Sequence, residues 1–218
     1  MIINPQDPRS IVSLLERVRR ILSSEQVQDE SFSGPYENVQ EIFQNEFGIT
    51  TSEDPKSILA TYGLVNCTSI LGLGKLNALS GVEPLTIGFL THYQHNTNID
   101  AAFGMLLYNL SKLTSGQSVC FESRIVGGLR GMSEKQIEQL RWKLTTPLRR
   151  DITFNLVEEK VLGDSPIDAV LDLKNRQTYY KYDPLQNPFR REHPEPWKME
   201  LIYTCKTPLL VYFPNNLQ

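Results

Sequence analysis

The feature that most constrains the fold of this chain is a change in hydrophobic period near Ser57. Upstream of Ser57, apolar residues recur at helical spacing, whereas downstream they form short extended runs separated by glycine and polar turns. Two further helical patterns, opening at Asp100 and Ser133, interrupt these runs. Strands that outnumber helices, with the helices between them, are typical of the α+β class. We therefore expect an α+β fold of mixed or antiparallel β-sheets, sandwich-like and flanked by helices, with an N-terminal helical extension.

The N-terminal extension is predicted to contain two helices. Asp7 and Pro8 have the pattern of an N-cap followed by proline at the first helical position, and apolar residues follow at helical spacing. A second helix is expected from about Pro35, with an apolar face that ends at Phe47. Gly48 then stands where a C-terminal glycine belongs.

The remainder of the chain is predicted to form strands and two helices. Strands are expected over residues 57–62, 68–71, 85–91, 118–126, 152–157 and 169–182, the last as a hairpin, with short strands over 200–203 and 209–213. Asp100 is expected to cap the first of these two helices. Ser133 and Gln136 form a capping box for the other, which begins at Ser133. Residues 72–81 are expected to form a loop, and Cys120 to be buried in its strand.

The chain is interpreted as a core with an extension at each end. Residues 1–50 form the helical extension and residues 51–184 the core. Residues 185–218, which are rich in proline and aromatic residues, are expected to pack on the core as a C-terminal extension. No internal repeat is present.

Composition excludes several classes of protein. The 218 residues carry a formal net charge of −3, so the basic excess of a nucleic-acid-binding protein is absent. The three cysteines, Cys67, Cys120 and Cys205, include no close pair, which argues against a disulfide framework and favours a reducing compartment. No signal peptide or apolar run of membrane-spanning length is seen. We expect a protein of the cytoplasm, or one translocated without a cleaved signal, with no membrane or nucleic-acid partner.

Three residues supply the groups that acyl transfer from an amide requires. Cys67 offers a thiolate nucleophile, His92 an imidazole that takes and returns the proton, and Thr61 a hydroxyl that holds the imidazole in orientation. An imidazole partner is expected to lower the pKa of the thiol. Each residue alone also has a structural interpretation, as a small core cysteine, a satisfied core histidine or a strand threonine. Their order and spacing favour the catalytic interpretation.

Four further residues are expected to contribute to substrate binding. Backbone N–H groups of the turn from Gly63 through Asn66 to Cys67 are predicted to form an oxyanion hole. Gly127 and Gly128 permit close backbone approach, either to the substrate or to Cys67.

Metal and cofactor sites are weighed against this interpretation. His92 and His95 suggest a metal pair, with Cys67 or Cys120 as a third ligand, but their spacing is not that of a zinc pair. Residues Gly72–Lys75 lack the spacing of a phosphate-binding loop. We therefore expect neither a metal nor a cofactor.

The order strand, Thr-x-Gly-x-x-x-Cys, strand, His, helix, strand, Gly-Gly, helix, strands resembles the CheD-type glutamine deamidases of bacterial chemotaxis. The resemblance covers about residues 57–182. The chain is also similar to the N-terminal asparagine amidohydrolases, whose histidine likewise follows Leu-Thr, and more distantly to the cytotoxic necrotizing factor deamidases. Thr61, Cys67 and His92 match the family threonine, nucleophile and histidine.

Two departures from the CheD pattern fall where the substrate would lie. Val65 and Asn66 stand where CheD-type proteins carry Gly-Ser, and Tyr93 and Gln94 replace apolar residues after His92. The resemblance implies a CheD-like core and a cysteine-dependent deamidase that acts on glutamine, with asparagine as the second choice, in a protein substrate. Two alternatives remain: a catalytically silent binding or regulatory module, and a transglutaminase or protease that uses the same pair.

Overall fold

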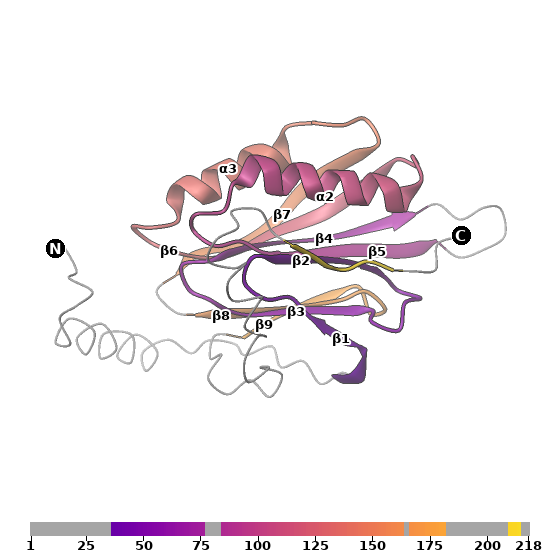
Figure 1. Cartoon of the computed structure of the whole chain (residues 1–218), viewed down its shortest axis with the longest axis horizontal. Coiled ribbons are helices and arrows are strands. Elements are labelled where there is room, and N and C mark those ends of the chain that lie inside the picture. The colour runs from indigo at the N-terminus through magenta and orange to yellow at the C-terminus, as the bar shows by residue number, and fades with distance from the viewer. Residues whose placement is uncertain (1–35, 77–83, 164–165, 182–208, 215–218) are drawn as a thin grey trace.

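The computed structural model describes residues 36–76, 84–163, 166–181 and 209–214. These residues form an α+β fold of two mixed β-sheets and two α-helices, which confirms the expected class. Figure 1 shows three layers, in which the helices cover one face of the larger sheet and the smaller sheet lies against its other face. Neither helix in these ranges has the length and apolar character needed to cross a membrane.

The larger sheet has six strands in the order β10-β2-β5-β4-β6-β7. Their bounds are Glu46–Thr51 (β2), Thr68–Leu76 (β4), Leu85–His92 (β5), Val119–Leu129 (β6), Ile152–Gly163 (β7) and Leu209–Tyr212 (β10). The two edge pairs, β10–β2 and β6–β7, are parallel, and the inner pairs are antiparallel.

The smaller sheet has four strands in the order β1-β3-β8-β9. Their bounds are Val39–Glu41 (β1), Ile58–Leu64 (β3), Ile167–Asp172 (β8) and Gln177–Lys181 (β9), and a short 3₁₀ helix η1, Tyr36–Asn38, precedes β1. The β1–β3 pair is parallel and the others are antiparallel. The hairpin of β8 and β9 confirms the turn expected within residues 169–182.

Helices α2 (Ile99–Thr114) and α3 (Glu134–Thr145) bury the faces that their periodicity predicts. The N-cap of α2 is Asn98, whose side-chain oxygen accepts a hydrogen bond from the Ala101 amide at 3.1 Å, so the expected cap at Asp100 is wrong. Asn98 has the extended backbone that a cap requires, whereas Asp100 lies within the first helical turn.

Strand alternation buries both faces of the larger sheet in apolar cores. On the helix-covered face of the larger sheet, Phe89 and Phe121 pack edge-to-face with ring centroids 5.3 Å apart, and Phe154 stacks on Phe121. Between the two sheets, a second core contains Leu59 from β3 and Leu90 from β5. The two faces of the larger sheet are therefore buried against different partners.

The helix expected from Pro35 to Phe47 is wrong. Residues 39–41 form β1, and residues 46–51 form β2 between β10 and β5. The apolar residues that suggested a helix are shared among η1, β1, the turn after β1 and the start of β2, so their spacing imitates a helix. The helix expected after Asp7 and the strand expected over 200–203 lie outside the described residues.

The loop expected over residues 72–81 is also wrong in its described part, because β4 continues to Leu76. Gly72 lies within the strand, and a Cβ atom there would come within 2.2 Å of the Phe89 ring. Glycine at this position therefore marks close packing. Cys120 is exposed, against expectation, because the alternation along β6 directs it away from the core.

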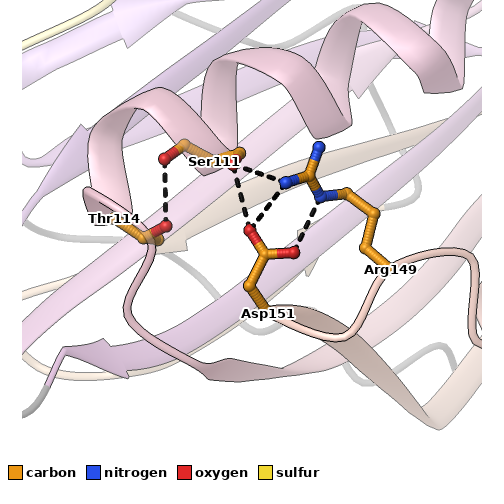
Figure 2. A network of polar contacts seen from close by, with 4 residues as sticks. All are labelled: Ser111, Thr114, Arg149 and Asp151. Carbon is orange, nitrogen blue, oxygen red and sulfur yellow. Dashed lines mark hydrogen bonds and ion pairs between the residues drawn. The ribbon is translucent and has the colours of Figure 1, made fainter.

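A surface network secures the segment that leads from α3 into β7. The Arg149 guanidinium donates to both oxygens of the Asp151 carboxylate and to the Ser111 hydroxyl on α2 (Figure 2). Ser111 also donates to Asp151 at 3.0 Å, and Thr114 donates to the Ser111 carbonyl. The hydrogen bond from Arg149 lowers the pKa of Asp151 to about 2, so the carboxylate stays charged at neutral pH.

Candidate active site

The antiparallel edge between β4 and β5 brings Cys67 and His92 onto one face of the larger sheet. Thr68 and Tyr93 exchange both backbone hydrogen bonds, at 2.9 and 2.7 Å. Cys67 precedes Thr68 and His92 precedes Tyr93, so both side chains point away from the face of that pair. Diagonal neighbours of this kind lie about 7–8 Å apart, within reach of long side chains. The strand pairing therefore brings Cys67 and His92, which are distant in sequence, close together at the ends of β4 and β5.

Thr61 reaches the same place from the other sheet. It lies on β3, and its hydroxyl oxygen is 2.7 Å from His92 Nδ1 and 2.9 Å from the Ile42 carbonyl oxygen. A hydroxyl has one proton, and the Ile42 carbonyl can only accept it, so Thr61 accepts from His92 Nδ1–H. This contact assigns the tautomer of the imidazole and leaves Nε2 with its lone pair.

The unprotonated Nε2 atom of His92 is buried and able to accept a proton. His92 is 5% exposed, and its Nε2 has no hydrogen-bond partner among the described residues. Burial lowers the pKa of His92 to about 4, an effect that its contact with the Ile42 carbonyl opposes. At neutral pH the imidazole is therefore uncharged and able to accept a proton.

Cys67 is buried at the inner end of a short turn. The side-chain amide nitrogen of Gln44 donates to the sulfur at 3.3 Å, and the Asn66 side-chain oxygen lies 3.5 Å from it. Burial raises the pKa of the thiol, and the hydrogen bond from Gln44 opposes that shift. The expectation of a lowered thiol pKa is thus wrong for this state, because desolvation of the sulfur outweighs its hydrogen bonds.

The predicted turn residues Gly63 and Asn66 are engaged by the protein itself. Gly63, at φ +66°, lies at an irregularity of β3, and its amide donates to the Asp168 carboxylate at 2.7 Å. The Asn66 carbonyl accepts from the Ser133 hydroxyl at 3.1 Å. The Gly63 amide is thereby directed at Asp168, whereas the Asn66 side chain remains beside the sulfur.

Gly127 and Gly128 hold the backbone of Cys67. The Gly128 amide donates to the Cys67 carbonyl at 2.8 Å. A Cβ atom on Gly127 would lie 2.6 Å from that same carbonyl oxygen, and both glycines have φ near +85°. Of the two expected approaches, to the substrate or to Cys67, the structure contains the approach to Cys67.

The start of α3 braces the site, and the predicted capping box is wrong. Ser133 is the N-cap but makes no side-chain cap bond; its hydroxyl instead bridges the Leu129 amide and the Asn66 carbonyl. Gln136 accepts from the Thr68 hydroxyl at 2.8 Å and donates to the Gln94 carbonyl. The start of α3 is thus bonded to the two neighbours of Cys67, Asn66 and Thr68, and to Gln94, two residues after His92.

His95 and Gly72–Lys75, which had suggested a metal or a phosphate site, both lie in the described ranges. No three His, Cys, Asp or Glu side chains in these ranges gather closely enough to hold a metal ion. His95 is exposed, and Gly72–Lys75 belong to β4.

Sequence reasoning missed Gln44 and the Ile42 carbonyl, since both lie in the segment assigned to a helix. The polar run of Gln44, Asn45 and Glu46 between Phe43 and Phe47 was the available signal for a turn. Asn45 adopts φ +59°, a left-handed conformation that asparagine tolerates better than most residues.

Comparison of the chain with protein-family models gives no match, and the search of curated proteins gives none either. The chemistry of the site is therefore inferred from its own contacts.

Proposed function

We propose that this protein is a cysteine-dependent amidohydrolase that deamidates a side-chain amide, glutamine before asparagine, in a protein substrate. The observation that carries the proposal is the hydrogen bond between Thr61 and His92 Nδ1, which leaves Nε2 free on the face shared with Cys67. A nucleophile, a base and a group that orients the base are the parts of a catalytic triad.

The proposed reaction has two halves. In the first, the Cys67 thiol passes its proton to His92 Nε2 while the sulfur bonds to the amide carbon. The intermediate then breaks its C–N bond, and the imidazolium protonates the nitrogen, which leaves as ammonia. In the second, His92 takes a proton from water, the oxygen attacks the thioester carbon, and the C–S bond breaks as the sulfur regains its proton. Thr61 keeps the ring in one orientation throughout.

The electrostatics of the resting site favour proton transfer in step with attack. Burial disfavours both the thiolate and the imidazolium, so the pair rests as a neutral thiol and a neutral imidazole. The bound amide would then complete the polar environment that the ion pair needs. This differs from a site in which a thiolate is formed in advance.

We further propose that the core is CheD-like. The order of β3, Cys67, β4, β5, α2, β6 with its two glycines, α3 and the following strands fits that plan. The departures at Val65 and Asn66 then point to a different substrate. Val65 and Met132, which are 38% and 56% exposed, lie on the two loops that meet through Asn66 and Ser133. Exposed apolar side chains beside the site suit a protein substrate.

The first experiment measures alkylation of Cys67 by iodoacetamide from pH 5 to 9, in a background in which Cys120 and Cys205 are serine. We expect the rate to fall at least about 10-fold in His92→Ala, a general-base contribution being typically about 10² or more. Thr61→Val, which keeps the shape of the side chain but removes the hydroxyl, should lie between the two. His95→Ala is the matched control and should match the parent.

An alkylation profile that ignores His92 would contradict the proposal. A positive result justifies incubation of a cell extract with the parent protein or with Cys67→Ala. Peptides that gain the mass of deamidation at glutamine only with the parent protein would identify the substrate.

A second candidate function is a silent binding module. The observation in its favour is burial, because Cys67 and His92 are only 3% and 5% exposed in the described state. It predicts an ordinary, slow thiol whose reactivity is the same with and without His92.

A further inference from the structure

We infer that Gln44 stabilises the oxyanion of the acyl-transfer intermediate, an inference that rests on the proposed function. Its side-chain amide nitrogen lies 3.3 Å from the Cys67 sulfur. Gln44 thus contacts the atom that would bond to the substrate, and no sequence pattern pointed to it.

The loop that carries Gln44 is tied to the other members of the site. The Ile42 amide donates to the Ala60 carbonyl at 2.7 Å, and the Ile42 carbonyl accepts from the Thr61 hydroxyl. On the far side of Gln44, the Asn45 amide donates to the His92 carbonyl at 2.9 Å. The residues before and after Gln44 are therefore fixed to β3 and to β5.

The Glu46 side chain closes this loop. Its carboxylate accepts from the Phe43 amide at 2.8 Å, and the Glu46 amide donates back to the Phe43 carbonyl at 3.0 Å. Asn45 and Glu46 are buried and Gln44 is half-buried, so packing against the core adds to these hydrogen bonds. A donor on a turn braced in this way is held in place before the substrate arrives, which is what makes an oxyanion donor effective.

The chemistry places negative charge within reach of this donor. When the sulfur bonds to the amide carbon, the C=O electron pair moves to the oxygen, which lies one bond beyond that carbon. A primary amide has two N–H donors and is neutral. It can therefore exchange its contact with the sulfur for one with the oxygen without a change of charge.

One backbone donor of the turn is already engaged elsewhere. The oxyanion hole expected from the Gly63–Cys67 turn loses the Gly63 amide, which donates to Asp168. Removal of one oxyanion donor from an acyl-transfer site typically costs about 10²–10³ in rate.

The experiment compares two reactions of the same thiol, again with Cys120 and Cys205 replaced by serine. Acylation of Cys67 by p-nitrophenyl acetate forms an oxyanion, whereas alkylation by iodoacetamide forms none. In Gln44→Met, which keeps the length but has no donor, we expect acylation to fall about 10²-fold. Alkylation should fall far less than acylation, because it loses only the hydrogen bond from Gln44 to the sulfur, which opposes the raised pKa of the thiol. Gln44→Ala should behave in the same way as Gln44→Met.

The control is Gln40→Met, because Gln40 lies on β1 and donates to the neighbouring Glu41 carbonyl. Both of its rates should match the parent, and thermal unfolding verifies that each variant is folded. An acylation-to-alkylation ratio that stays constant in the Gln44 variants would overturn the inference, whether both rates fall or neither does.

A parent protein that is alkylated with help from His92 but not acylated would overturn the role of Gln44 and leave the Cys67–His92 pair standing. Alkylation that ignores His92 would remove the proposed function itself, and the inference with it.

Discussion

The two faces of the six-stranded sheet are built from the same strands but bury different kinds of side chain. The face under the helices is an apolar core in which Phe89, Phe121 and Phe154 pack ring against ring. The opposite face is apolar in its middle, but at one end it buries Cys67 together with His92, whose ring is hydrogen-bonded to Thr61.

The comparison indicates which face stabilises the fold and which face carries the candidate site. Apolar side chains contribute to stability through burial alone, with no need for a specific partner. Buried polar groups stabilise only when they are paired, and His92 Nε2 is left without a partner in the described residues. We infer that the helix-covered face stabilises the fold. The other face stabilises it less, because it buries the unpaired Nε2 atom of His92.

The largest expected effect comes from opening the helix-covered face. Phe121→Ala removes a fully buried ring from the aromatic cluster, and the free energy of unfolding should fall by about 3–5 kcal/mol. Urea unfolding at pH 7 measures it. Cys120→Ala, one residue away and exposed, should change the stability by less than about 0.5 kcal/mol. Equal losses in the two variants would show that this face is not the source of stability.

The next effect perturbs the other face through its backbone. Gly127→Ala forces a side chain into φ +86° and against the Cys67 carbonyl oxygen, so we expect a loss of about 2–3 kcal/mol and a slower Cys67 alkylation. Gly131→Ala is the matched control, because it has φ +85° but no atom within 4 Å of the new Cβ. It should lose less stability and keep the reactivity of the parent. Identical behaviour of the two would mean that strain alone, not contact with Cys67, decides.

The smallest effect is the pH dependence that His92 adds. The folded protein keeps this imidazole neutral down to pH about 4, whereas the unfolded chain protonates it below about 6.5. The unfolded state therefore binds more protons between these values, and stability falls as the pH drops through that window. Between pH 7 and pH 5 the loss should be about 2 kcal/mol.

Urea unfolding of the parent and of His92→Asn at both pH values isolates this contribution. The variant should lose about 2 kcal/mol less than the parent on acidification. His95→Asn, on an exposed residue, should keep the slope of the parent. A slope that survives the removal of His92 would assign the pH dependence to other groups.

Much of the fold follows from local pattern. The alternation of β6 over residues 119–124 and the apolar stripe of α2 are visible in the sequence, because each of these stretches is buried on one side. The prediction failed at β2, whose Phe47 completes a helical spacing with apolar residues of η1, β1 and the turn between β1 and β2, and at Gly72, whose missing side chain makes room for Phe89. In both cases the segment is buried by residues that are distant in sequence, so its local pattern does not reveal its structure.

The candidate site divides in the same way. Cys67, His92 and Thr61 could be named from the sequence because a thiol, an imidazole and a hydroxyl are the groups of a triad, and because their order resembles that of the CheD-type deamidases. Gln44 could not be found, nor could the bracing of the turn by Ser133 and Gln136, because these contacts join residues far apart in the chain.

By itself, the sequence determined the fold class, most strands, the buried face of each helix and three candidate catalytic residues, since all of these depend on local periodicity and side-chain chemistry. Only the tertiary structure decided how the two sheets meet. That meeting brings the Thr61 hydroxyl to His92, directs the proton of the ring and raises the pKa of the Cys67 thiol. The physical reason is that hydrogen-bond geometry and desolvation depend on which distant segments exclude water from a side chain.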